Sequence, residues 1–402
     1  MGKKTVYDAI VVGSGATGGL AVKELTERGM RVLLLEAGRK LNPTKPYGIS
    51  PLPYDLKYRN LISPTILYKN HQPIQSKCYA CDEYGHRFFI NDVKNPYTTH
   101  RGKPFDWIRA RQVGGRTIMW GRHSYRFSDY DFKAASLDGH GENWPISYKD
   151  LEPYYERVER FIGVSGSVEN LPQLPDSIFI PPMELTFSEM MLKVAVENRW
   201  KDRKVITARV ASYFNSVSST LPLAIETGLL TLRSKAIASH ILVDSNTGKA
   251  KGVAFIDQIT KKEYEAFSNI VVLCASTIES ARLLLNSSSR QYPNGLGNNS
   301  SNAVGCYLMD HTCVESSSGI VPAAAKYPYK FDDGVNVGVY IPRFRNIRNK
   351  HPKFIRGYGI QALTLRRTLP THLHHIPGFG GEFKEMVRET PNAPSCWIGA
   401  FG

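Results

Sequence analysis

Three glycines near the start of the chain have a spacing that suits phosphate binding. Gly13, Gly15 and Gly18 form the pattern G-x-G-x-x-G directly after an apolar run at residues 6–12. In this pattern the first glycine allows a tight turn, the second lets a diphosphate approach the backbone, and the third lets a helix pack closely on a strand. Glu36 lies 21 residues after Gly15 and is placed to accept a hydrogen bond from a ribose hydroxyl. We therefore predict a dinucleotide site.

The residues around these glycines have the pattern of a strand, a helix and a second strand. Residues 6–12 are apolar and β-branched, residues 16–29 are predicted to form a helix, and residues 32–35 are predicted to form the next strand. The first amides of that helix would face the diphosphate. A glycine-rich turn in another α/β protein is the alternative, but it does not explain why all these features occur in register.

Less regular sequence follows this unit. Residues 40–104 are rich in Pro, Tyr and Asn and are expected to form a long excursion. Ser147 and Asp150 have capping-box spacing at the start of a predicted helix, and a second helix is expected at 184–199.

The second half of the chain is predicted to be rich in strands. Ser276 and Glu279 are expected to cap a helix that ends near Asn286. The predicted strands comprise a β-meander, a parallel strand and an antiparallel sheet. They are residues 229–232, 236–243, 252–256, 263–267, 270–276, 335–341 and 358–365.

Composition and charge argue against several classes of partner. The 402 residues carry a net charge of +15, but the basic residues are scattered over 101–126, 201–204 and 343–353 without a nucleic-acid-binding motif, so no nucleic-acid partner is expected. No apolar run reaches the roughly 20 residues of a membrane span, and no secretory signal is recognised, so a cytoplasmic location is expected, with membrane association through a partner left open. Cys78 and Cys81 have no second pair to complete a zinc site, so no metal is expected.

Further motifs follow the glycine pattern in a characteristic order. They are Val113-Gly-Gly115 with Trp120-Gly-Arg122, Trp144-Pro-Ile146, residues 273–286 and residues 304–311. Together with the glycine pattern and Glu36, they resemble the glucose–methanol–choline (GMC) flavin oxidoreductases, in particular the bacterial branch of gluconate 2-dehydrogenase flavoproteins and pyranose-oxidase-like enzymes. The resemblance covers nearly the whole chain. It implies FAD-dependent oxidation of a CH–OH group in an alcohol, sugar or sugar acid, with hydride transfer to flavin N5.

The resemblance also implies which residues surround FAD. Gly114 and Gly115 would lie against the flavin and its diphosphate, while Ile237 and residues 274–276 would lie near the ADP part. Met119 occupies the position at which some relatives carry a flavin-linked histidine, so non-covalent FAD is expected. The expected FAD-binding residues are Gly13, Ser14, Gly15, Thr17, Gly18, Glu36, Ala37, Gly38, Arg109, Gly114, Gly115, Trp120, Gly121, Ile237, Cys274, Ala275 and Ser276.

The catalytic base is not identified by these motifs. In the family a histidine with a His or Asn partner lies in a late C-terminal segment, and we expect that pair beyond residue 402, which would leave this chain incomplete for catalysis. His123, His311 and the cluster His372–His375 are expected to be polar or structural residues rather than bases or metal ligands. One or two of a group of arginines are expected to hold the diphosphate or an acidic sugar. The group consists of Arg109, Arg111, Arg116 and Arg122.

We expect an α/β fold, α+β overall, with two discontinuous domains. Residues 1–135 and 205–315 would form a split Rossmann-like FAD-binding domain with a parallel sheet and a β-meander. Residues 136–204 and 316–402 would form a substrate-binding domain with an antiparallel sheet and helices. An NAD(P)-dependent dehydrogenase and a non-catalytic flavin-binding fragment, or a half-protein that needs a second chain, are the alternative functions. The expected substrate is a small alcohol or sugar, with a partner subunit or a quinone as a possible electron acceptor.

Overall fold

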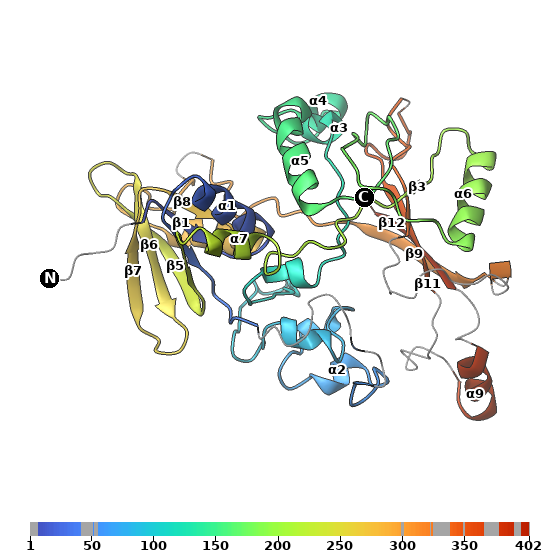
Figure 1. Cartoon of the computed structure of the whole chain (residues 1–402), viewed down its shortest axis with the longest axis horizontal. Coiled ribbons are helices and arrows are strands. Elements are labelled where there is room, and N and C mark those ends of the chain that lie inside the picture. Colours follow the sequence, from blue (N-terminus) through green and yellow to red (C-terminus); the bar gives the residue numbers. More distant parts are fainter. Residues whose placement is uncertain are drawn as a thin grey trace. The chain divides into compact units, whose positions relative to one another are not determined.

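The structure is a computed structural model that describes residues 7–41, 51, 55–298, 301–321, 323–324, 338–348, 350–365, 378–389 and 395–401. The chain divides into two compact units (Figure 1). Unit 1 comprises Met1–Trp120 and Asn215–Met309, and unit 2 comprises Gly121–Phe214 and Asp310–Gly402. Each unit is therefore assembled from two separate stretches of sequence, and each is described below by itself.

A parallel sheet lies at the centre of unit 1. Its strands run in the order β4 (Leu230–Arg233), β2 (Val32–Leu35), β1 (Ala9–Val12) and β8 (Val271–Leu273). All neighbouring pairs are parallel, with Ile10 opposite both Leu33 and Val271. The predicted parallel sheet is confirmed.

Strands β1 and β2 are apolar throughout because both of their faces are covered. Ala9 and Val11 pack with α1 (Ala16–Glu27) and α7 (Thr220–Glu226) on one face. Ile10 and Val12 alternate with them and pack toward the second sheet of the unit. This arrangement explains the uninterrupted apolar run in the sequence, since a strand buried on both faces has no polar side to alternate with.

The second sheet of unit 1 is an antiparallel meander of β5 (Ala236–Val243), β6 (Ala250–Asp257) and β7 (Glu263–Phe267), drawn in yellow in Figure 1. Its buried side chains, among them Ile241, Val253 and Phe255, pack against β1 and β2, together with Leu283 from α8 (Thr277–Asn286). The predicted meander is confirmed.

In its described part, the predicted excursion contains only short helices. These are α2 (Pro64–Leu67) and the 3₁₀ helices η2 (Gln75–Lys77) and η3 (Gly85–Phe88), and a further 3₁₀ helix, η4 (Gly115–Ile118), follows it. Buried amide and carboxylate side chains hold this segment together through hydrogen bonds. For example, Gln75 Nε2 donates to Asp92 Oδ1 at 2.8 Å. Cys78 and Cys81 are free thiols, and burial raises the pKa of Cys81 to about 12. Within the described ranges, no group of three or more His, Cys, Asp or Glu side chains could hold a metal ion.

Unit 2 is built on an antiparallel sheet. The strand order is β3 (Ile206–Thr207), β10 (Val339–Ile341), β11 (Gly359–Leu365), β12 (Ser395–Phe401) and β9 (Cys313–Ile320). The antiparallel sheet predicted from residues 335–341 and 358–365 is confirmed where it is described, and residues 335–337 lie outside the described residues.

The helices of unit 2 are α3 (Asp129–Phe132), α4 (Ala134–Asp138), α5 (Tyr148–Ile162), α6 (Phe187–Arg199) and α9 (Gly380–Glu389). The predicted capping box at α5 is present, because Asp150 Oδ2 accepts from both the backbone N–H and the hydroxyl of Ser147, at 2.8 and 2.7 Å. None of the helices in the described part of the chain is long and apolar enough to cross a membrane.

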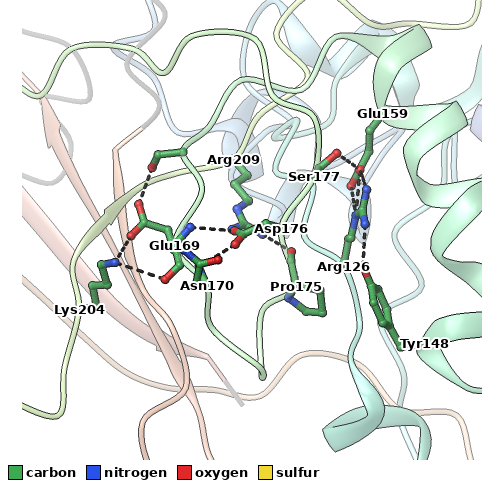
Figure 2. A network of polar contacts seen from close by, with 11 residues as sticks. Arg126, Tyr148, Glu159, Glu169, Asn170, Pro175, Asp176, Ser177, Lys204 and Arg209 are labelled. Atoms are coloured by element: carbon green, nitrogen blue, oxygen red, sulfur yellow. Dashed lines mark hydrogen bonds and ion pairs between the residues drawn. The ribbon is translucent and has the colours of Figure 1, made fainter.

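Buried ion pairs organise the loops of unit 2 (Figure 2). Arg126 pairs with Glu159 of α5, and Arg209 pairs with Asp176 at 2.5 Å. The carboxylate of Asp176 also accepts from the backbone N–H groups of Glu169 and Asn170.

The boundaries of the two units differ from the domain boundaries expected from the sequence. Residues 121–135, 205–214 and 310–315 were expected to belong with the glycine-rich domain, but they lie in unit 2. Ser124 N donates to Arg209 O at 2.8 Å and Ala211 N donates to Arg122 O at 2.9 Å, so the first two segments hold each other. Such long-range pairing leaves no signal in either segment alone.

We predict that Glu189→Gln makes the stability of unit 2 less dependent on pH. Glu189 is 3% exposed, and burial outweighs its hydrogen bonds with Thr186 and raises its pKa. A carboxyl group with a raised folded-state pKa contributes stability that is fully present below its unfolded pKa and is lost as pH rises through the folded pKa. Glutamine does not titrate, so the difference in Tm between about pH 5 and about pH 8 should shrink in calorimetry. An unchanged difference would contradict the prediction.

Candidate functional site

A cavity of about 370 Å³ opens in unit 1 around the loop that follows β1. Most of the residues expected to bind FAD lie in its wall, although they come from distant parts of the sequence. Those that line it are Gly13, Ser14, Gly15, Thr17, Glu36, Ala37, Arg109, Gly115, Trp120, Ile237, Cys274, Ala275 and Ser276.

The three glycines of the first motif have three different environments. A Cβ atom added to Gly13, whose φ is +98°, would lie 2.3 Å from the carbonyl oxygen of Cys274. A Cβ at Gly18 would lie 1.8 Å from the carbonyl oxygen of Gly13, so α1 approaches the loop as closely as backbone atoms allow. A Cβ at Gly15 would meet nothing within 4 Å. Gly13 and Gly18 are therefore required by the fold, whereas Gly15 leaves space free at the cavity.

Glu36 follows β2 and is fixed by hydrogen bonds at the cavity wall. Its Oε2 accepts from the backbone N–H of Ser14 at 3.1 Å and from the Ser14 hydroxyl at 2.6 Å, and its Oε1 accepts from Gly38 N at 2.7 Å. Burial raises the pKa of Glu36, while these bonds and the nearby Arg111 act in the opposite direction. A carboxylate has about four lone-pair sites, so acceptor capacity remains for a ligand hydroxyl.

The turn formed by Gly114 and Gly115 packs directly on the glycine-rich loop. Both residues have positive φ, at 90° and 54°, and a Cβ at Gly115 would lie 3.1 Å from Gly15 Cα. Of the expected FAD-binding residues that do not line the cavity, Gly18, Gly38 and Gly114 shape the backbone beside it, and Gly121 belongs to unit 2.

Arg109 is a buried cation in the wall of this cavity. The residue is 7% exposed, and its Nη2 donates to Asn95 O at 2.6 Å. Its Nε is buried and has no hydrogen-bond partner in the described part of the chain. Burial lowers the pKa of this guanidinium group. A buried cation in a cavity wall suits an anionic ligand.

Two cavity residues, Glu279 and Arg282 on α8, were not identified as site residues from the sequence. Glu279 was expected to close a capping box, but it accepts from Arg282 Nε at 2.6 Å and from Arg111 Nη2 at 3.1 Å. Burial raises its pKa, but these two partners together outweigh burial and lower it. The charge of Arg111 is therefore paired with Glu279 within the protein. Because the two residues are 168 positions apart, the local sequence around either of them does not indicate this pairing.

The expected cap at Ser276 is wrong for a backbone reason. Ser276 precedes α8 with φ 80° and ψ 165°, and its side chain makes no capping hydrogen bond. This region of backbone conformation is populated almost only by glycine and costs about 1–3 kcal/mol for other residues.

We predict that Ser276→Gly stabilises the cofactor-free chain by about 1 kcal/mol, since relief of the strain exceeds the entropic cost of glycine. Urea unfolding measures the change. Lys235→Gly, at a φ of 58° in the more tolerated left-handed region, is the matched control and should gain less. A loss of stability in Ser276→Gly would show that the serine side chain contributes more than the strain costs.

The two described candidate histidines, His123 and His311, have different environments. His123, in unit 2, is half-buried, and burial lowers its pKa. The side chain of His311 is 84% exposed and pairs with Asp310. The cluster His372–His375 lies outside the described residues. The location of the catalytic pair therefore stays a prediction.

Comparison with known proteins identifies the family. The family model of the GMC oxidoreductases matches residues 7–313, which include the whole cavity wall. The chain belongs to the GMC oxidoreductase family. The resemblance inferred from the motifs is confirmed, FAD is the cofactor of this family, and the NAD(P)-dependent alternative is not supported.

Relatives within the family act on different alcohols. The chain is 27% identical to 2-methyl-1,2-propanediol dehydrogenase from Mycolicibacterium austroafricanum, over 95% of this chain and 69% of that protein. It is 26% identical to the fructose dehydrogenase large subunit from Gluconobacter japonicus, over 77% of this chain and 59% of that protein. It is also 26% identical to a gluconate 2-dehydrogenase flavoprotein from Pantoea cypripedii, over 40% of this chain and 26% of that protein. The chain thus spans only part of the length of each relative.

Proposed function

We propose that this protein oxidises a CH–OH group of an alcohol, sugar or sugar acid and that unit 1 holds FAD non-covalently in the described cavity. One observation carries the proposal: the open position at Gly15 lies in the wall of the same cavity as Glu36 and Gly115 of the second glycine turn. When bound, FAD supplies the hydride acceptor for alcohol oxidation.

The residues of the cavity fit the parts of a dinucleotide. The first amides of α1 carry no intrahelical partner and provide donors for a diphosphate beside Gly15. Glu36 retains acceptor capacity for a ribose hydroxyl, and its carboxylate is held in place by Ser14 and Gly38. Arg109 places a buried cation in the wall of the same cavity. The α1 amides and Arg109 are therefore suited to an anionic group of the ligand, and Glu36 is suited to a hydroxyl-bearing group.

Arg116 supplements this positive charge. It lines the cavity, and its Nη2 donates to the carbonyl of Ile108 in the same wall. Since Arg111 and Arg282 are paired with Glu279, we assign the neutralisation of the diphosphate to Arg109 and Arg116.

The proposal extends to the partners of the reaction. One relative is the large subunit of fructose dehydrogenase, which supports a partner subunit as the electron acceptor, with a quinone as the alternative. The substrates named for the relatives support a polyol, sugar or sugar acid. A cytoplasmic location is retained as a prediction.

Two measurements on the purified full chain test the proposal separately. Flavin that co-purifies and is released into the supernatant by acid would support non-covalent FAD, whereas flavin retained in the protein pellet would overturn it. Anaerobic addition of 2-methyl-1,2-propanediol, fructose or gluconate should then change the absorbance spectrum of the bound flavin with at least one of them, because binding, unlike turnover, does not depend on the catalytic pair expected beyond residue 402. A chain that binds FAD but whose flavin spectrum responds to none of these compounds would retain the cofactor assignment and lose this substrate assignment.

A further inference from the structure

Three buried hydroxyl groups join the two glycine turns of unit 1 in a closed set of hydrogen bonds. We call Ser14, Thr117 and Ser216 the hydroxyl ring; their residues are 0%, 5% and 0% exposed. Gly114 N donates to Ser14 Oγ at 3.0 Å, and Thr117 Oγ1 donates to Gly114 O at 2.6 Å. Ser216 N donates to Thr117 Oγ1 at 3.0 Å, and Ser216 Oγ donates to Gly15 O at 2.9 Å.

The direction of each hydrogen bond in the ring is fixed. Each hydroxyl has one proton to donate, and the protons of Thr117 and Ser216 go to backbone carbonyls. The proton of Ser14 goes to Glu36 Oε2 at 2.6 Å. Ser14 therefore links the ring to the carboxylate at the cavity wall. The backbone N–H and carbonyl of Gly114 both have partners in the ring.

The hydroxyl ring acts on the peptide groups that border the cavity. The carbonyl of Gly15 already accepts the first helical N–H of α1, from Gly19 at 2.8 Å, and Ser216 adds a second donor. In a planar trans peptide the next N–H points the opposite way, so fixing this carbonyl also fixes the N–H of Ala16, a residue of the cavity wall.

We propose that Ser14, Thr117 and Ser216 are positioning residues for the dinucleotide: their hydroxyl ring locks the Gly114–Gly115 turn onto the glycine-rich loop and holds Glu36 as a hydrogen-bond acceptor. This inference rests on the proposed FAD site, and it concerns hydroxyl groups whose hydrogen bonds are made to the protein. The hydrogen bonds that link the segments of the three members span 99 to 201 residues, so each of the three comes from a separate part of the sequence.

Ser14 should differ from the other two members because it alone contacts Glu36. Its hydroxyl and its backbone N–H both favour the ionised carboxylate, and Arg111 is the charged group that acts on Glu36 in the same direction. Removal of the hydroxyl should therefore raise the pKa of Glu36 and move the pH midpoint of FAD binding upward. Removal of the hydroxyl of Thr117 or Ser216 should leave that midpoint in place.

The test is FAD titration of the cofactor-free full chain, followed by flavin fluorescence across a range of pH. Ser14→Ala, Thr117→Val and Ser216→Ala are each expected to weaken FAD binding roughly tenfold, and only Ser14→Ala should shift the pH midpoint. Thr117→Ser retains the hydroxyl and should bind like the wild type. Circular dichroism checks each fold, and Ser216→Cys replaces Ser216→Ala if the alanine variant does not fold.

Ser268→Ala is the matched control within unit 1. Ser268 is 1% exposed and its hydroxyl donates to Asp8 O at 3.1 Å, but it does not line the cavity. It should lower the stability of the chain and leave FAD affinity unchanged. Ring variants that bind FAD with wild-type affinity, or a Ser14→Ala variant with an unshifted pH midpoint, would overturn the positioning role. A wild-type chain that binds no FAD would instead overturn the proposed function, and this inference with it.

Discussion

Gly15→Ala is expected to leave unit 1 folded and to weaken FAD binding by about 100-fold. A Cβ at this position would contact nothing within 4 Å in the protein, so the folded chain has room for it. In our assignment that room belongs to the diphosphate, and a methyl group there would separate the phosphate oxygens from the amides of the loop. Loss of about two hydrogen bonds to a charged group costs roughly 3 kcal/mol, which corresponds to about 100-fold in affinity.

Gly18→Ala, three residues away, supplies the matched comparison. Its Cβ would lie 1.8 Å from the carbonyl oxygen of Gly13, and backbone atoms cannot move aside as a flexible side chain can. We expect a loss of about 3 kcal/mol or more in the free energy of unfolding, visible by calorimetry without cofactor. The two variants thus separate binding from folding. A Gly15→Ala chain that binds FAD as tightly as the wild type would place the diphosphate elsewhere.

The sequence allowed prediction of those parts of unit 1 that depend on local chemistry. The glycine spacing, the buried strands and the acidic residue after β2 all follow from the needs of one strand–helix–strand unit. The capping box at Ser147 was predictable for the same reason, since its two members are three residues apart. Such features are determined by neighbours in the chain, and the structure contains them at the expected positions.

The remainder of the site depends on contacts between distant segments. Ser216 belongs to the ring only because α7 packs on α1, and Glu279 pairs with Arg111 only because the segment that follows the excursion meets α8. The same limit produced the error at Ser276. The sequence has the spacing of a capping box there, but the backbone conformation of Ser276 differs from that of a capping residue. A motif reflects the local structural preferences of its own segment, and a tertiary contact can override those preferences.

The ion pair between Arg126 and Glu159 in unit 2 provides the second large expected effect. The side chains are 1% and 7% exposed, and Arg126 donates through Nε and Nη2 to the carboxylate, with the shortest distance 2.5 Å (Figure 2). Arg126 Nη1 also donates to the hydroxyl of Tyr148 at 2.7 Å, and Ser177 donates to Glu159. Both charges are therefore satisfied only while the pair is intact.

Glu159→Leu is expected to lower the free energy of unfolding of unit 2 by about 3–5 kcal/mol, because it leaves a buried guanidinium group without its counter-charge. The double variant Arg126→Met/Glu159→Leu should recover most of that loss, since a buried ion pair often contributes little more than apolar residues of similar size. Asp106→Asn, in a pair with Lys77 whose side chains are 54% and 53% exposed, is the surface control and should cost less than about 1 kcal/mol. Urea unfolding of the variants gives the coupling energy of the buried pair. If the double variant were as unstable as Glu159→Leu alone, the cost would come from lost packing and hydrogen bonds around Tyr148 and Ser177 rather than from the unpaired charge.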